Sequence, residues 1–431
     1  MNREDLGYSV FRFILPFYCK SDNGNVNEPF CLSDWKQLSI NTKYLTQSVY
    51  ELFETADKSA VCKRYSLNDN SREKYGIPNR FNKVLMESRM PACEGKYNIV
   101  FTGHRIIWFE SGFGFLVMDV QIPEIELSEA ANMSFCLSNL FTNAHDGGEK
   151  VNNLLFSYED NLGKHELSVK NSLMKLIFGD GSGKNIELFP SSTRNRLVTY
   201  HSVITDQIIC EKDKFISCLA NSLHSGIKYD VNYDNGTVIY SFAEQNWYLG
   251  ANGVASYAIY DGHDTFVTKV HKRNIDIDYF YIFIIALHER EVLLKDNYLA
   301  VKYRNNPKEL IKLKPQLLTA DIIYSFNTVS IESSYQRFYA SLVGVFNLES
   351  LRSDIRNVVE NVERHVNDKN DQKVNAVLAA ISMLAIFSAL TDGVGFADRI
   401  ESGSAFGILQ WGIIILISVS IVVASSIFRK K

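Results

Sequence analysis

Apolar and polar residues follow different patterns in the two parts of this chain. Residues 1–325 hold short apolar runs of strand length, which are separated by turn-rich segments such as Ser21–Pro29. From about Ile331 to Leu390 apolar residues recur at steps of three and four, which is the helical period. The pattern predicts an α+β protein with a large mixed α/β cytosolic domain over 1–325, followed by a long stalk helix over 326–373.

The first part alternates between expected strands and expected helices. The strands are Tyr8–Tyr18, Tyr97–Phe101, Arg105–Phe109, Gly114–Ile122, Leu197–Ile204, Thr237–Phe242, Ala255–Tyr260 and Phe266–His271, and the helices are Leu32–Ala60, Asp213–Ser225 and Glu309–Tyr324. The nine apolar residues Tyr279–Leu287 are too few to span a membrane, and they predict a buried strand that runs into a helix. We expect one domain; two lobes divided near residues 145–195 are the alternative.

Proline placement favours a continuous helix in the second part. All eight prolines lie at or before Pro315, and proline is the residue that most often interrupts a helix. An unbroken helix over Ile331–Leu390 would be on the order of 90 Å long. A pair of helices interrupted near Gly344 is the alternative, because glycine weakens a helix.

Two uncharged apolar runs near the end of the chain predict membrane spans. Gly407–Phe428 has 22 such residues, enough for a helix to cross a hydrocarbon core roughly 30 Å thick. Val374–Leu390 has 17, at the short end of the spanning range. Joined by Thr391–Phe406, the runs predict a transmembrane hairpin over 374–431.

Basic residues around this hairpin predict its orientation. The linker holds Arg399 alone, whereas seven Lys and Arg residues flank the outer ends of the hairpin: Arg356, Arg364, Lys369, Lys373, Arg429, Lys430 and Lys431. Because Lys and Arg are enriched on the cytoplasmic side, we expect a multi-pass protein of the inner (cytoplasmic) membrane, with both termini and the basic tail in the cytoplasm.

Small and polar residues share one face of the first run and predict a pore lining. These residues are Asn375, Ala379, Ser382, Ile386 and Ala389, at steps of four and three. Asp368 and Asp371 before the run and Asp392 after it would form acidic rings at the pore mouths of a homo-oligomer, which would favour cations. Close dry packing of small residues between helices is the alternative.

Composition narrows the functional classes. The chain has 431 residues, of which 46% are hydrophobic and 22% charged, and its formal net charge is −4. This balance excludes a basic protein that coats nucleic acid and an acidic disordered protein, so no direct nucleic-acid partner is expected. The seven cysteines show no C-x-x-C spacing, which indicates reduced thiols rather than a disulfide framework or a zinc cluster.

The motifs of common enzymes are missing from the sequence. The segment Phe178–Asn185 (FGDGSGKN) resembles a phosphate-binding loop, but the first glycine of that motif is replaced by Phe178 and its Ser or Thr by Asn185. A surface hairpin that joins Leu173–Phe178 to Ile186–Phe189 is the favoured reading. No catalytic constellation appears, so we predict that the protein is not an enzyme; an enzyme tethered to the membrane is the alternative. A metal ligand set is not identified.

One short segment mixes aromatic and basic residues in the manner of a nucleotide site. His104, Arg105 and Trp108 of TGHRIIWF could bind a nucleotide-type small molecule through ring stacking and phosphate pairing. The alternative is an ordinary strand end with a tryptophan in the core.

The order of these parts resembles the CorA family of two-span ion channels and transporters. That family carries a Gly-Met-Asn signature at the outer end of the first span, where this chain reads Leu390-Thr391-Asp392-Gly393-Val394-Gly395-Phe396. With this departure and an enlarged cytosolic domain, the chain is most similar to the divergent CorA-like effectors of type III CRISPR systems.

The resemblance implies a function. It implies a pentameric homo-oligomer in the lipid bilayer, gated by a nucleotide second messenger, the conjugate of S-adenosylmethionine with AMP, which disrupts membrane integrity in antiviral defence. A CorA-type channel or transporter for a divalent cation, magnesium, is the alternative.

Overall fold

The computed structural model describes most of the chain up to residue 398. The described residues are 9–20, 30–39, 44–53, 61–90, 93–123, 125–142, 145–146, 149–150, 154–160, 163–179, 185–192, 194–205, 209–227, 238–242, 245–259, 270, 272–303, 306, 309–313, 315 and 326–398. Contacts divide the chain into two compact units, Met1–Val301 with Gln316–Ile355, and Lys302–Pro315 with Arg356–Lys431.

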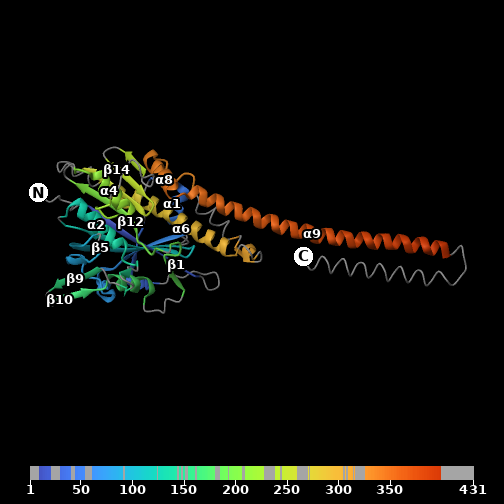
Figure 1. The fold of residues 1–431 in the computed structure, drawn as a ribbon, viewed down its shortest axis with the longest axis horizontal. Coiled ribbons are helices and arrows are strands. Elements are labelled where there is room, and N and C mark those ends of the chain that lie inside the picture. Colours follow the sequence, from blue (N-terminus) through green and yellow to red (C-terminus); the bar gives the residue numbers. More distant parts are fainter. Residues whose placement is uncertain are drawn as a thin grey trace. The chain divides into compact units, whose positions relative to one another are not determined.

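The first unit contains a sheet of 13 strands with helices on both faces (Figure 1). The strands are β1 (Val10–Cys19), β2 (Trp35–Gln37), β3 (Cys62–Leu67), β4 (Val84–Ser88), β5 (Gly95–Phe109), β6 (Phe113–Gln121), β9 (Leu154–Asp160), β10 (Gly163–Leu167), β11 (Ile186–Leu188), β12 (Val198–Thr205), β13 (Val238–Phe242), β14 (Gln245–Gly250) and β15 (Gly253–Ile259). A separate pair is formed by β7 (His145–Asp146) and β8 (Glu149–Lys150).

The α-helices are α1 (Gln47–Phe53), α2 (Leu127–Ser138), α3 (Val169–Phe178), α4 (Lys212–Asn221), α6 (Phe280–Tyr303), α8 (Ser333–Val345) and α9 (Leu348–Asp398). Three short 3-10 helices lie at Leu32–Asp34, Asp69–Ser71 and Glu73–Tyr75, and a π-helical turn at Ile275–Tyr279 leads directly into α6.

The sheet is mostly antiparallel. Its main path runs β10-β9-β4-β5-β6-β1-β12-β15-β14-β13, with β2, β3 and β11 paired beside it. Along this path the neighbours are antiparallel except β12 and β15, which are parallel. The sheet confirms the mixed α/β character expected for the first part of the chain.

Side chains alternate between the two faces of the sheet, as the pleat requires. On β1, Phe11 and Phe13 enter the main core with residues of α2 and α4 such as Met133. Arg12 points the other way, since its guanidinium carbon lies 4.8 Å from the ring of Phe280 at the start of α6. The sheet therefore separates a core under α2 and α4 from a second layer under α6.

The prediction of two C-terminal membrane-spanning helices is wrong for the part of the chain that the structure describes. No helix there is long and apolar enough to cross a bilayer. Val374–Leu390 belongs to the 51-residue helix α9, which carries many charged side chains up to Lys373. The second predicted span, 407–428, lies outside the described residues. The predicted multi-pass inner-membrane location depends on these helices and is contradicted by the same finding.

The segment Tyr279–Leu287 is helical, which contradicts the predicted strand. It begins in the π-helical turn and continues as α6, and all nine of its side chains are buried. An apolar run that is buried on every side has no period to distinguish a strand from a helix.

The long helix is interrupted, as the alternative reading proposed. Helix α8 ends at Val345 and α9 begins at Leu348, and Asn347 between them has a φ of 54°. This left-handed conformation suits asparagine better than most residues and ends the helix. The predicted unbroken helix over Ile331–Leu390 is therefore wrong.

Two smaller predictions are also wrong. The expected helix Leu32–Ala60 is a 3-10 turn, the strand β2 and the short helix α1, with 54–60 outside the described residues. The expected hairpin after Leu173 does not form, because 169–178 is the helix α3 and β11 pairs with β1 instead. The expected strand Phe266–His271 falls almost entirely outside the described residues.

Candidate functional site

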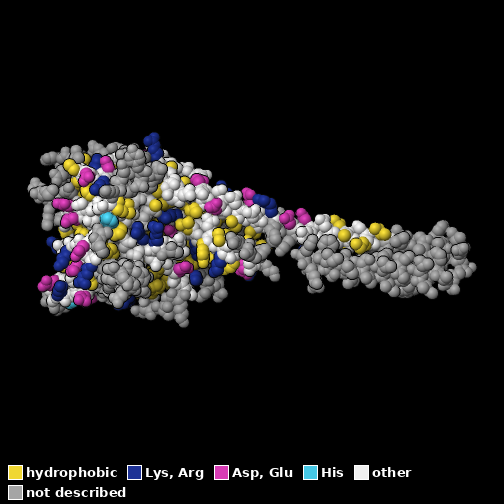
Figure 2. Space-filling model, in the orientation of Figure 1, with side chains coloured by type: hydrophobic (Ala, Val, Ile, Leu, Met, Phe, Trp, Pro, Cys, Tyr) yellow, Lys and Arg dark blue, Asp and Glu magenta, His cyan; other side chains and the backbone are white. Residues whose placement is uncertain are grey.

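A cavity of about 570 Å³ lies where β10 leads into α3. Its wall is built by β4, β5, β9, β10, the first turn of α3 and the segment after α2. Volumes of roughly 300–1,000 Å³ are usual for small-molecule sites. Figure 2 shows that Lys and Arg side chains lie among Asp and Glu side chains on the surface over β9 and β10.

Three lysines line this cavity, and each comes from a different element. They are Lys96 of β5, Lys164 of β10 and Lys170 of α3, and they face two carboxylates, Glu87 and Glu166. The Nζ atom of Lys96 lies 3.8 Å from Glu87. The lining therefore has an excess of one positive charge, which favours an anionic ligand.

The start of α3 adds backbone donors to the same cavity. Ser168, Val169 and Lys170 line it, and Ser168 is the N-cap residue whose side chain makes no capping hydrogen bond. The first N–H groups of a helix have no partner within the helix, and they bear a partial positive charge. The first turn of α3 thus borders the same cavity as Lys164 and Lys170.

Apolar side chains form much of the remaining wall. Leu85, Met90, Leu140 and Leu155 line the cavity, and Leu155 is 39% exposed, on the strand β9. The neighbouring positions on β9 point into the core, so alternation along the strand leaves Leu155 facing outward. A ligand with an anionic group and a flat apolar ring would match this combination.

A second cavity, of about 440 Å³, lies beside the first. The two share Glu166, Leu167 and Ser168 at the junction of β10 and α3. The second is also lined by Tyr75, by Lys175 and by other residues of α3. The two cavities are therefore adjacent and meet at this junction.

The residues His104, Arg105 and Trp108 do not form one surface. Successive side chains of β5 alternate, so His104 and Trp108 are buried on the side of the main core, 3% and 2% exposed, whereas Arg105 faces α6. Burial lowers the pKa of His104 to about 3. Trp108 stacks on Phe17, with ring centroids 5.8 Å apart.

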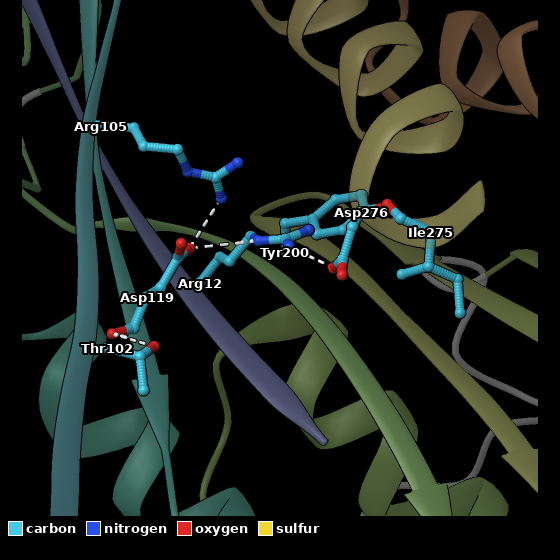
Figure 3. Close-up of polar contacts among 7 residues, drawn as sticks. All are labelled: Arg12, Thr102, Arg105, Asp119, Tyr200, Ile275 and Asp276. Atoms are coloured by element: carbon cyan, nitrogen blue, oxygen red, sulfur yellow. Dashed lines mark hydrogen bonds and ion pairs between the residues drawn. The ribbon is translucent and has the colours of Figure 1, made fainter. Parts of the chain in front are cut away.

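Arg105 belongs instead to a buried network of charges (Figure 3). Its Nη2 atom lies 2.8 Å from Oδ1 of Asp119 on β6, and Nε of Arg12 lies 3.2 Å from the same oxygen. Arg12 also binds Asp276 in the π-helical turn. The network therefore connects β1, β5 and β6 to the segment that begins α6.

Charge pairing sets the electrostatics of this network. Burial acts to raise the pKa of Asp119, but Arg105 and Arg12 outweigh it and hold that pKa below its usual value. Each arginine keeps a buried nitrogen without a hydrogen-bond partner, Nη1 of Arg12 and Nε of Arg105. Nearby, the hydroxyl of Tyr200 donates to the carbonyl of Ile275 at 2.6 Å.

The predicted pore residues all lie on α9. The side chains of Asn375, Ala379, Ser382 and Ile386 are exposed, and so are those of Asp368 and Asp371. Ala389 and Asp392 are also helical, but their side chains are outside the described part.

Sequence reasoning missed the three lysines of the cavity. Lys96 and Lys170 are separated by 73 residues. Their elements come together only through the pairings of β5 with β4, of β4 with β9 and of β9 with β10. No local motif marks them. Over the described ranges up to residue 398, no group of three or more His, Cys, Asp or Glu side chains could hold a metal ion.

No protein-family model matches this chain, and no curated protein matches it.

Proposed function

We propose that this protein is a homo-oligomeric sensor of a nucleotide-type second messenger. The observation that carries the proposal is the cavity at the β10–α3 junction, where Lys96, Lys164 and Lys170 and the start of α3 surround a space of about 570 Å³. Lysine ammonium groups and helix N-termini both bind phosphate. The apolar wall beside them suits a base.

The second cavity supports a ligand with two parts. The conjugate of S-adenosylmethionine with AMP, which the CorA-like resemblance implies, carries two nucleosides joined through a phosphate. In the proposed complex the phosphate lies near Ser168, which borders both cavities. One nucleoside then occupies each cavity.

Self-assembly is assigned to α9. Val374, Val377, Leu378 and Ile381 are 54–58% exposed, and they follow one another at steps of three, one and three. This spacing puts them on a single stripe of the helix, as in coiled coils. Figure 2 shows hydrophobic side chains along the surface of α9. Burial of the stripe between copies of the chain would remove it from water.

Calorimetric titration of the full chain tests ligand binding. The S-adenosylmethionine–AMP conjugate, AMP, S-adenosylmethionine and magnesium chloride are titrated separately. We expect the conjugate to bind most tightly. The double variant Lys164→Glu/Lys170→Glu should weaken its binding about tenfold or more, because each substitution removes a charge-assisted contact with the ligand. Lys36→Glu on β2, an exposed position outside both cavities, should bind normally. Binding of magnesium alone would favour the divalent-cation alternative.

Native mass spectrometry of the full chain tests assembly. Leu378→Glu/Ile381→Glu places two like charges in the stripe and should shift the protein to smaller species. Gln372→Glu, at an exposed polar position of the same helix, should not change the subunit number. An unchanged oligomer in the double variant would rule out assembly through this stripe.

A further inference from the structure

Two buried cysteines lie sulfur to sulfur near the first cavity. The Sγ atoms of Cys93 and Cys136 are 2.7 Å apart, although the residues are 43 positions apart in sequence. Cys93 precedes β5, and Cys136 is in the last turns of α2. They are 4% and 0% exposed. A contact this close between two thiols places them within easy reach of a covalent bond, whose sulfur atoms are about 2 Å apart.

Polar groups around the pair favour ionisation of one sulfur. Ser88 Oγ lies 3.2 Å from Cys136 Sγ and 3.9 Å from Cys93 Sγ. The hydrogen bond with Cys136 lowers the pKa of Cys93, whereas the hydrogen bond with Cys93 and burial raise the pKa of Cys136. Cys93 is therefore the sulfur that ionises more readily and attacks first. Cys136 is placed to complete the reaction by its position, 2.7 Å from the Cys93 sulfur.

We infer that Cys93 and Cys136 form an oxidation site at which a peroxide produces a reversible disulfide. The Cys93 thiolate attacks one oxygen of hydrogen peroxide, the O–O bond breaks, and the product is a sulfenic acid at Cys93 with release of hydroxide, which takes up the proton lost by the thiol to become water. The Cys136 sulfur then attacks the sulfenic sulfur, the S–O bond breaks and a second water leaves. In total two thiols and one peroxide give one disulfide and two waters.

The bond would fasten two elements that border the cavity. The backbone N–H of Cys93 donates to the carbonyl of Met90, and that of Asn139 donates to the carbonyl of Cys136. Met90 and Asn139 both line the cavity. Oxidation therefore joins the segment before β5 to α2 at the wall of the cavity, without depending on what the cavity binds.

Thiol counting on the full chain tests the inference. We expect equimolar hydrogen peroxide to reduce the number of thiols that react after denaturation from seven to five. Peptide mapping without reductant should recover Cys93 linked to Cys136. The midpoint temperature of thermal unfolding should rise by about 5 °C, because the cross-link restricts the unfolded chain. Dithiothreitol should reverse all three changes.

Cysteine-to-serine variants distinguish this pair from the other thiols. The background Cys31→Ser/Cys210→Ser removes the exposed thiols and should still lose two thiols on oxidation. Cys93→Ser and Cys136→Ser should each abolish the linked peptide, whereas Cys218→Ser, at another buried cysteine, should retain it. Seven remaining thiols in the wild-type chain, or a bond that joins other cysteines, would overturn the inference. The wild-type map decides the question even where a serine variant folds poorly.

Discussion

The Nε atom of Arg352 donates a 2.6 Å hydrogen bond to Oε1 of Glu289, and both side chains are almost completely buried, at 3% and 1% exposure. The hydroxyl of Tyr339 donates to the other oxygen of Glu289 at 3.1 Å. These contacts join α6, α8 and the first turns of α9 within the first unit. A buried charge is costly without its partner, so the pair decides how firmly the start of α9 is held.

Removal of one partner of this pair should destabilise the protein strongly. We expect Arg352→Met to lower the free energy of unfolding by about 3–5 kcal/mol, because the Glu289 charge stays buried and loses its partner. The double variant Glu289→Leu/Arg352→Met should recover much of that loss. Urea unfolding measures both changes. Arg364→Met, in an exposed pair with Glu360, should change stability by about 0.5 kcal/mol or less. Equal losses at the two arginines would contradict the argument.

A buried histidine predicts a loss of stability in acid. Burial lowers the pKa of His288 to about 3, and its ring stacks on Phe109 with centroids 3.8 Å apart. Unfolded histidine takes up a proton near pH 6.5, whereas the folded one does not until about pH 3. Between these values the unfolded state binds more protons, so this group removes about 1.4 kcal/mol of stability for each unit by which the pH falls.

Replacement of that histidine should flatten the pH profile. Between about pH 6 and pH 4, we expect His288→Gln to reduce the slope of the unfolding free energy against pH by about 1.4 kcal/mol per pH unit. This change corresponds to the uptake of one proton. Urea unfolding at several pH values gives the slope. The same slope in both proteins would show that His288 titrates alike in the folded and unfolded chain.

The sequence predicted the ends of several strands better than it distinguished a fully buried helix from a strand. Strands with clear ends, such as β12 and β6, lie within one residue of the expected ranges Leu197–Ile204 and Gly114–Ile122. Tyr279–Leu287 was misread because α6 is surrounded by protein there, and uniform burial erases the helical period. The helix break was signalled by Asn347, a residue that tolerates a positive φ, rather than by the nearby Gly344.

The candidate site was less predictable than the fold. Basic and aromatic residues are close in sequence around His104 and Arg105, which is typical of a nucleotide site, yet adjacent residues of a strand point to opposite faces. Lys96, Lys164 and Lys170 meet only through the tertiary fold. A pattern of single residues separated by dozens of positions carries no local period from which a cavity could be inferred.

A partly buried lysine predicts that stability depends on pH in the alkaline range as well. Burial lowers the pKa of Lys295 to about 7, although Asp296 and Glu187 act to raise it. Its Nζ atom lies against the ring of Tyr18. From about pH 7 to 10.5 the unfolded lysine is protonated and the folded one is not, so stability rises with pH in that range.

Removal of the lysine charge should therefore stabilise the protein near neutral pH. We expect Lys295→Met to raise the unfolding free energy at pH 7 by about 2 kcal/mol, and to abolish most of the increase above that pH. Chemical unfolding at pH 7 and pH 9 measures both effects. Lys302→Met, at an exposed position near the end of α6, should leave stability at pH 7 unchanged. A lower stability of Lys295→Met at pH 7 would mean that the Tyr18 contact outweighs the cost of burial.

Replacement of two glycines by alanine should change stability in opposite directions. A Cβ atom at Gly253 would lie 2.1 Å from the carbonyl oxygen of Thr199, the residue that it faces across the parallel pair β12 and β15. Backbone atoms cannot move aside there without breaking that pairing, so we expect Gly253→Ala to lower the unfolding free energy by about 3 kcal/mol or more. At Gly344 of α8 nothing lies within 4 Å of the added atom, and alanine is the better helix former, so Gly344→Ala should raise stability by about 0.5–1 kcal/mol. Urea unfolding of the two variants provides the comparison, and a stable Gly253→Ala protein would contradict the close approach of these two strands.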